Sequence, residues 1–239
     1  MNEEGEKSDE ENYNLAQKDD EVFDIYPPPP SPSRYNCMIT SDWGETYFPS
    51  PLPTGQTKTR RAIHCEGDWH RSVQVWIVQK VSKDGRVRVL LQRRSKYKDT
   101  HPNMLDVSCA GHIDSGEDIV KSAVRELYEE LGGNGNLQYT ENDLEMSKAF
   151  VVTSSIKGET AKYGSFICNE YQDVFILWWK DENTSIDSSM FAPMNKEEVA
   201  GFEVVDGQEL VRRMRGGDES LVPRASDYVN ALAKALCLE

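Results

Sequence analysis

The chain has 239 residues, of which 38% are hydrophobic and 28% charged, a composition typical of a soluble globular protein with a sizeable core. No run approaches the 18 consecutive apolar residues that a membrane-spanning helix needs. The acidic start, Met1 to Glu11, lacks both the apolar core of a secretory signal and the arginines of a transit peptide. We therefore expect a cytoplasmic protein, with the nucleus as a second compartment, and no membrane partner.

The formal charge of −14 is unevenly placed along the chain. Residues 1–24 hold ten acidic residues and two lysines, a net −8, and the remainder carries −6. This balance lacks the broad basic surface that binds duplex DNA or RNA, so nucleic acid is disfavoured as a partner. The five cysteines are odd in number and never spaced as CxxC, which argues against a disulfide framework and a structural zinc site. The sequence does not define the oligomeric state, and a homodimer is among the expected partners.

The first 34 residues predict a disordered leader. They are acidic and polar and end in a proline tract over residues 27–32, which favours an extended chain. We expect this leader to contribute nothing to the core and to precede a single domain over residues 35–239.

The pattern of residues 35–239 predicts an α/β domain. Strands are expected over 71–80 and 86–93, joined by a hairpin turn at Asp84-Gly85, because both segments alternate and are rich in β-branched residues. Next come a short apolar segment over 105–110 and a helix over 117–131. The apolar stripe of this helix is formed by Val120, Val124, Leu127 and Leu131. The remaining expected elements are strands over 150–155, 173–180 and 197–203 and helices over 208–215 and 225–236. Strands on both sides of a central helix, with helices at the end, indicate a mixed sheet sandwiched by helices.

The central helix carries a cluster of carboxylates. Glu126, Glu129 and Glu130 lie at positions i, i+3 and i+4, so they share one face, which we expect to lie opposite the apolar stripe. Three like charges repel one another, but hard oxygen ligands gathered in this way suit Mg²⁺ or Mn²⁺. A cation bound there would bridge the protein to phosphate oxygens. The plain alternative is a solvated acidic face, which is common for any pair of glutamates.

The wider spacing resembles the Nudix box. The positions that match it are Gly111, Glu117, Arg125, Glu126, Leu127, Glu129, Glu130 and Gly132. The single departure is Gly133, where the family usually has an aliphatic residue, and it affects packing at the end of the helix. The resemblance implies a Nudix α/β/α sandwich with a mixed sheet and a loop-helix-loop motif.

The same resemblance implies the chemistry and the roles of these residues. Glu126, Glu129 and Glu130 would be metal ligands together with the Gly111 carbonyl. Arg125, two turns after Glu117, would pair with it and hold these carboxylates in place. Glu126, Glu129 and Arg125 would be catalytic. The expected activity is hydrolysis of a diphosphate linkage, in a nucleoside diphosphate derivative or another small organic diphosphate, by a water that Mg²⁺ or Mn²⁺ activates.

A wider resemblance, over residues 64–73, 98–113 and 169–175, is to the isopentenyl-diphosphate-isomerase-like subgroup of Nudix proteins. His70 and His112 match the metal-binding histidines of the isomerase, and Glu170 matches its catalytic glutamate and is expected here as a general base. The isomerase also has a cysteine directly before the Gly-His that opens the box. This chain has Ala110 there, and Cys109 one residue earlier should point to the opposite face of a strand.

Alternatives to the hydrolase remain. An isomerase acting on prenyl diphosphates is supported by the wider resemblance and weakened by Ala110. A non-catalytic Nudix scaffold is disfavoured because such a module has no need to keep mutually repelling carboxylates. A kinase-like phosphotransferase is disfavoured because the sequence lacks a GxxxxGK[ST] loop. For His70 and His112 a structural hydrogen-bonding role is the plain alternative, and for Cys109 it is a small buried apolar residue.

Overall fold

A seven-stranded mixed sheet forms the centre of the computed structural model, which describes residues 18–29, 51–81, 85–132, 139–160, 164–181, 184–193 and 195–238. The strand order is β5-β4-β3-β8-β7, with β6 paired to β3 and β9 paired to β4. The strands are β3 (Trp69–Lys80), β4 (Val87–Arg94), β5 (Leu105–Asp106), β6 (Cys109–His112), β7 (Lys148–Thr160), β8 (Gly164–Trp178) and β9 (Val199–Asp206). β3 pairs parallel with β8 and antiparallel with β4 and β6, which makes the sheet mixed as expected.

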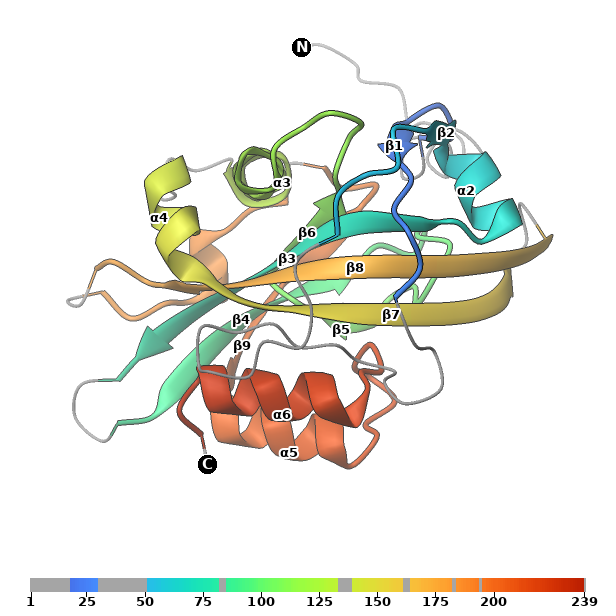
Figure 1. The fold of residues 1–239 in the computed structure, drawn as a ribbon. Coiled ribbons are helices and arrows are strands. Elements are labelled where there is room, and N and C mark those ends of the chain that lie inside the picture. Colours follow the sequence, from blue (N-terminus) through green and yellow to red (C-terminus); the bar gives the residue numbers. More distant parts are fainter. Residues whose placement is uncertain are drawn as a thin grey trace, which may run out of the picture.

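Helices cover both faces of this sheet (Figure 1). The helices α3 (Ile119–Leu131) and α4 (Glu141–Ser147) lie on one face, and α5 (Gly207–Arg215) and α6 (Ser226–Ala235) lie on the other. Alternation along β3 supplies both cores: Trp76 and Val78 pack under α5 and α6, whereas Val75 and Ile77 pack under α3. The α/β/α sandwich predicted from the sequence is therefore confirmed.

Several short elements escaped the sequence prediction. They are β1 (Val22–Asp24), β2 (Thr57–Thr59), α2 (Arg60–Glu66), α4, the 3-10 helix η2 (Ser188–Met190) and the first half of β8. The sequence of α2 is mostly polar, but capping residues define both ends of the helix. The Thr59 side chain accepts a hydrogen bond from the Ala62 amide at its start, and Gly67 ends it in a left-handed conformation, with φ of 74°.

The prediction of a disordered leader is wrong for residues 18–29. Phe23 and Ile25 are buried in a small core with Ile63, and β1 pairs with β2. Farther along, the Tyr26 amide donates to the Trp69 carbonyl at 2.8 Å. Because the segment is acidic overall, its composition did not indicate a strand, although Phe23 and Ile25 have the i, i+2 spacing of one. The rest of the predicted leader, residues 1–17 and 30–34, lies outside the described residues, as does the start of the domain expected at Tyr35.

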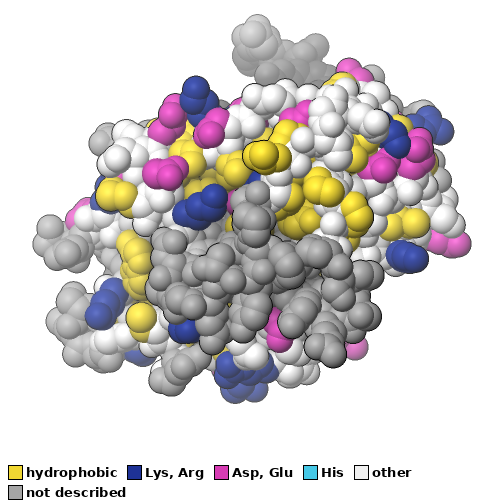
Figure 2. Space-filling view, viewed as in Figure 1, with side chains coloured by type: hydrophobic (Ala, Val, Ile, Leu, Met, Phe, Trp, Pro, Cys, Tyr) yellow, Lys and Arg dark blue, Asp and Glu magenta, His cyan; other side chains and the backbone are white. Residues whose placement is uncertain are grey.

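The surface shows no segregation of charge on the face seen in Figure 2, where acidic and basic side chains are intermixed among the described residues. Within the described part of the chain, no helix has the length and apolar content needed to cross a membrane.

Removing residues 1–29 should lower the melting temperature by at least about 5 °C. Burial of a Phe or Ile side chain contributes about 1.5–3 kcal/mol, and about 1 kcal/mol shifts the melting temperature of a domain of this size by about 2–4 °C. A chain that begins at Lys18 is the matched control and should melt higher than one that begins at Pro30. Equal melting temperatures for these two chains, measured by differential scanning fluorimetry, would contradict the packing described for Phe23 and Ile25.

Candidate active site

The helix α3 lies directly on strand β6 at Gly111. A Cβ atom placed on this glycine would lie 2.0 Å from the Glu126 carboxyl carbon, far inside van der Waals contact. Since Gly111 has no side chain, the carboxyl group of Glu126 can lie against the strand backbone. The glycine that opens the motif is thus a requirement of close packing.

Arg125 connects the two ends of the motif. Its guanidinium donates to Glu117 Oε2 at 3.0 Å, to Glu126 Oε1 at 2.7 Å and to the His112 carbonyl at 3.1 Å. Glu117 also accepts a hydrogen bond from the Ser122 hydroxyl at 2.7 Å. The predicted pairing of Arg125 with Glu117 is therefore present, and it fixes the Glu126 carboxylate against β6.

The prediction that the three glutamates lie opposite the apolar stripe is wrong for two of them. Glu126 is 8% exposed and Glu130 only 2%, whereas about half of the Glu129 side chain is exposed. Positions 126 and 130 neighbour the apolar positions 127 and 131 on the helix, so the buried arc is wide enough to include them. Glu130 Oε2 accepts hydrogen bonds from Gln92 Nε2 at 3.1 Å and from the Ala110 amide at 3.2 Å, which makes its burial tolerable.

Burial changes the acidity of these carboxyl groups. It raises the pKa of Glu126 to about 7, and the nearby charges of Glu198 and Glu129 act in the same direction. Burial, with the charges of Glu198 and Glu126, raises the pKa of Glu130 to about 8. With these raised pKa values, the two carboxyl groups retain protons near neutral pH. A divalent metal ion bound to their oxygens would displace these protons and compensate the buried negative charge.

Glu198 is a fourth carboxylate of this region, and no motif in the sequence points to it. It precedes β9, and Lys98 Nζ lies 2.5 Å from Glu198 Oε2. Burial acts to raise the pKa of Glu198, but the ion pair with Lys98 outweighs it and lowers the pKa, so this carboxylate is ionised at neutral pH.

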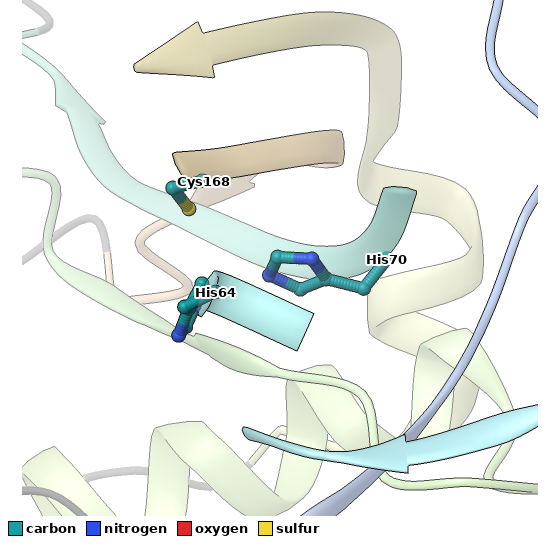
Figure 3. A group of neighbouring side chains, drawn as sticks. All are labelled: His64, His70 and Cys168. Atoms are coloured by element: carbon teal, nitrogen blue, oxygen red, sulfur yellow. The ribbon is translucent and has the colours of Figure 1, made fainter. Parts of the chain in front are cut away.

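A second group of ligand atoms comes from four separate elements. The nitrogens or oxygens of His70, His112 and Glu170 lie within 4.8 Å of one another, and so do the ligand atoms of His64, His70 and Cys168. Figure 3 shows His64 on α2, His70 on β3 and Cys168 on β8 gathered around one point. These are the sets of that kind found among the described residues, and the three box glutamates do not form one there.

The histidines of this group have the properties of metal ligands. Burial lowers the pKa of His64 to about 2 and that of His112 to about 4, so both are neutral at pH 7. The Nε2 atom of His64 is buried without a hydrogen-bond partner, whereas the Nε2 atoms of His112 and His70 lie 3.2 Å and 3.6 Å from Glu170 Oε1. Burial would raise the pKa of Glu170, but the adjacent imidazoles of His112 and His70 outweigh it and hold the pKa well below its usual range. Neutral imidazoles beside an ionised carboxylate fit a divalent cation such as Zn²⁺ or Mn²⁺.

Strand β6 separates the two groups. Gly111 faces the box glutamates, whereas Ala110 pairs with Gln74 and contacts the core under α5 and α6. Cys109 is fully buried in the core under α3, and burial raises the pKa of its thiol well above its usual value. The expectation that Cys109 points away from the face of Ala110 is confirmed. Members of both groups nevertheless line one cleft: Glu126 and Glu129 from the first, and His64, His112, Cys168 and Glu170 from the second.

The predicted site residues thus fall into two groups beside one cleft. The first consists of Gly111, Glu117, Arg125, Glu126, Glu129 and Glu130, of which Glu117 and Glu130 do not line the cleft. The second consists of His70, His112 and Glu170, of which His70 does not line it. The sequence prediction missed His64, Cys168 and Glu198. Only Cys168 had a usable signal, since it lies two residues before Glu170 on the same strand and therefore on the same face.

The sequence matches the family profile described as NUDIX domain over residues 69–225. The chain belongs to the Nudix family. It is 35% identical over 170 residues to Nudix hydrolase 3 of Arabidopsis thaliana, a match that covers 71% of this chain and 20% of that protein. It is 34% identical over 155 residues to an uncharacterized Nudix hydrolase of Clostridium acetobutylicum, covering 65% of this chain and 66% of the relative.

Other similarities are more limited. A protein named isopentenyl-diphosphate Delta-isomerase from Pectobacterium atrosepticum is 34% identical over 80 residues, which cover 34% of this chain and 41% of that protein. The crystal structure of DR0079 from Deinococcus radiodurans has a TM-score of 0.45 and 17% sequence identity, covering 90% of this chain and 99% of the other. The chain spans less than two thirds of the length of each of the relatives from Arabidopsis, Clostridium and Pectobacterium.

Replacing Glu130 with glutamine should stabilise the metal-free protein at pH 8.5 and leave its stability unchanged at pH 4.5. The folded-state pKa of Glu130, about 8, lies above the unfolded value, so its stabilising contribution is complete below about pH 4.5 and is lost as the pH rises through 8. Glutamine can still accept the bonds from Gln92 and Ala110 and carries no charge.

The measurement is the melting temperature in EDTA at both pH values. Glu145→Gln is the matched control, because Glu145 is exposed on α4 and lies outside the cleft, so its replacement should change neither value. A Glu130→Gln protein that melts no higher than the unsubstituted protein at pH 8.5 would show that the Glu130 charge carries no desolvation cost.

Proposed function

We propose that this chain hydrolyses a diphosphate linkage in a small organic substrate with Mg²⁺ or Mn²⁺ as cofactor. The observation that carries the proposal is the pair of buried carboxyl groups, Glu126 and Glu130, held against β6 where Glu126 lines a cleft. Burying acidic groups is costly unless a bound group compensates it. The intact Nudix box and the relatives named as Nudix hydrolases support the same reaction.

Different residues would bind the cation, position its ligands and accept a proton in this reaction. Glu126, Glu129 and Glu130, with the Gly111 carbonyl, would hold the cation, which when bound polarises phosphate oxygens and makes an attacking water more acidic. Arg125 keeps Glu126 in place through its bonds to Glu117 and to the His112 carbonyl. An ionised glutamate in the cleft would accept the proton of the water. Glu170, the residue expected from the sequence, contacts the histidines, whereas Glu198 lies nearer the box glutamates.

The walls of the cleft suit an anionic substrate with an apolar part. Basic side chains on its lining include Arg60, Arg94, Lys98 and Arg224, each of which also pairs with an acidic side chain. Apolar side chains on the lining include Ile156, Phe166 and Val222. Arginine and lysine bind phosphate oxygens by charge-assisted hydrogen bonds. A small organic diphosphate fits this lining. A panel of substrates would identify the group that is joined to the diphosphate.

Isomerisation of a prenyl diphosphate is the second candidate, because of the histidine group. His64, His70, His112, Cys168 and Glu170 would hold a second cation beside the first. Relatives named isopentenyl-diphosphate Delta-isomerase support this candidate. Ala110 weakens it, since the face that carries His112 lacks a cysteine at the position where the isomerase has its acid.

Metal removal and loss of one ligand charge should both abolish most of the activity. EDTA should stop turnover, and Mg²⁺ or Mn²⁺ should restore it. Glu129→Gln or Glu130→Gln should lower turnover by about a hundredfold or more, a barrier increase of about 3 kcal/mol. The assay measures phosphate and pyrophosphate release from nucleoside di- and triphosphates, dinucleotides, capped RNA, thiamine diphosphate and prenyl diphosphates.

The matched control is Glu145→Gln, which removes an exposed charge from α4 outside the cleft and should leave turnover unchanged. Full activity of a metal-stripped sample, or near-normal turnover of both Glu129→Gln and Glu130→Gln, would contradict the assignment of these glutamates as cation ligands.

Cys109→Ala should separate hydrolase from isomerase. Because Cys109 is buried under α3 with a raised pKa, its loss should leave diphosphate cleavage within a few-fold of normal. The measurements are kcat/KM for the best substrate of the panel and chromatographic detection of isomerised prenyl product. A thousandfold loss with the fold retained would instead make Cys109 the chemical acid.

A further inference from the structure

Strand β1 binds the loop that connects β6 to α3. The Val22 carbonyl accepts a hydrogen bond from the Ser115 amide at 2.8 Å. Asp24 Oδ1 accepts one from the Ser115 hydroxyl at 2.8 Å, and Asp24 Oδ2 accepts one from the Gly116 amide at 2.9 Å. Both oxygens of a single carboxylate are therefore used on two consecutive residues of this loop.

The loop has few other constraints at this point. Gly116 adopts a left-handed conformation with φ of 76°, and both Ser115 and Gly116 are exposed. A bond from the Glu117 amide to the Asp114 carbonyl, at 2.9 Å, closes the turn. Glu117 follows directly and positions Arg125, which in turn holds Glu126. A displacement of residues 115 and 116 would therefore reach Glu126 through two side-chain contacts.

The strand that presents Asp24 is itself firmly held. The Phe23 ring is fully buried and stacks on the His112 ring, with centroids 4.7 Å apart and planes 15° apart. On the same segment, Glu21 Oε2 accepts a hydrogen bond from Arg60 at 2.9 Å. Because Phe23 and Glu21 are fixed on either side of Val22, the adjacent Asp24 carboxylate has a defined position against the loop.

We propose that Asp24 is a positioning residue of the active site, acting through Ser115 and Gly116 on Glu117, Arg125 and finally Glu126. This inference rests on the proposed function, since Glu126 is a cation ligand there. The N-terminal segment is thereby part of the machinery of the domain.

The test compares Asp24→Ala with Asp20→Ala, Asp24→Asn, Ser115→Ala and the Asp24→Ala/Ser115→Ala double variant. Asp20 is an exposed acid of the same segment that does not line the cleft, so its replacement controls for the loss of charge. Two quantities are measured well below each melting temperature: kcat and KM with Mg²⁺ on the best substrate of the panel, and the Kd for Mn²⁺ of metal-free protein by electron paramagnetic resonance.

For Asp24→Ala we expect kcat to fall by about tenfold or more with KM within about twofold, because small displacements of a catalytic group are costly. The Kd for Mn²⁺ should rise at least severalfold. Asp24→Asn should be intermediate, since its amide oxygen can still accept the Ser115 bond. The double variant should be no worse than Asp24→Ala alone, because both changes break the same connection.

Normal kcat and normal Mn²⁺ affinity in Asp24→Ala, a loss equal to that of Asp20→Ala, or losses that add fully in the double variant would each overturn the proposal. If the unsubstituted protein cleaves nothing in the panel, the hydrolase assignment fails, and the Mn²⁺ affinities still decide the role of Asp24.

Discussion

The close contact between α3 and β6 at Gly111 is the constraint on which the rest of the site depends. Any side chain at position 111 would occupy the place of the Glu126 carboxyl group, 2.0 Å from a Cβ atom there. Moving the helix outward would break the bond from Arg125 to the His112 carbonyl and the bonds from Gln92 and the Ala110 amide to Glu130. The spacing of the motif therefore records one packing geometry, in which a glycine, an arginine and two glutamates are mutually dependent.

The buried carboxyl groups that suit a cation lower the stability of the metal-free protein. Two carboxyl groups whose pKa values are raised to about 7 and about 8 are partly protonated at neutral pH, so the metal-free fold bears a desolvation cost. Hydrogen bonds from Gln92 and Ala110 offset part of it at Glu130, and the Arg125 guanidinium does so at Glu126. A bound cation would remove the remainder, so a preorganised cation site and a destabilised metal-free helix are two aspects of the same arrangement.

Prediction from sequence worked where a long periodic pattern agreed with the tertiary structure. The strands β3 and β4, the helix α3 and the pairing of Arg125 with Glu117 all follow from local spacing. It failed where a short element derives its stability from contacts distant in sequence. Phe23 lies in an acidic segment, yet it is buried against His112, 89 positions later. Likewise, spacing along the helix placed Glu126 and Glu130 on a shared face but could not reveal that β6 covers this face, because the width of the buried arc depends on the sheet.

The alternation of side chains along β6 explains why one cleft has features of two reactions. Residues 109 and 111 face α3, whereas residues 110 and 112 face the opposite side, where His112 joins His70 and Glu170. A hydrolase needs only the α3 side of this strand, and an isomerase needs an acid on the other side. Ala110 leaves that side of β6 with ligand atoms and without an acid, because Cys109 is directed into the core. The thiol beside the histidines is that of Cys168, which belongs to β8. The histidine side would then bind a diphosphate or a cation, whereas β6 supplies no thiol on that side to protonate a double bond. The proposed hydrolysis would use the other side of the strand, because that side carries Glu126 against Gly111.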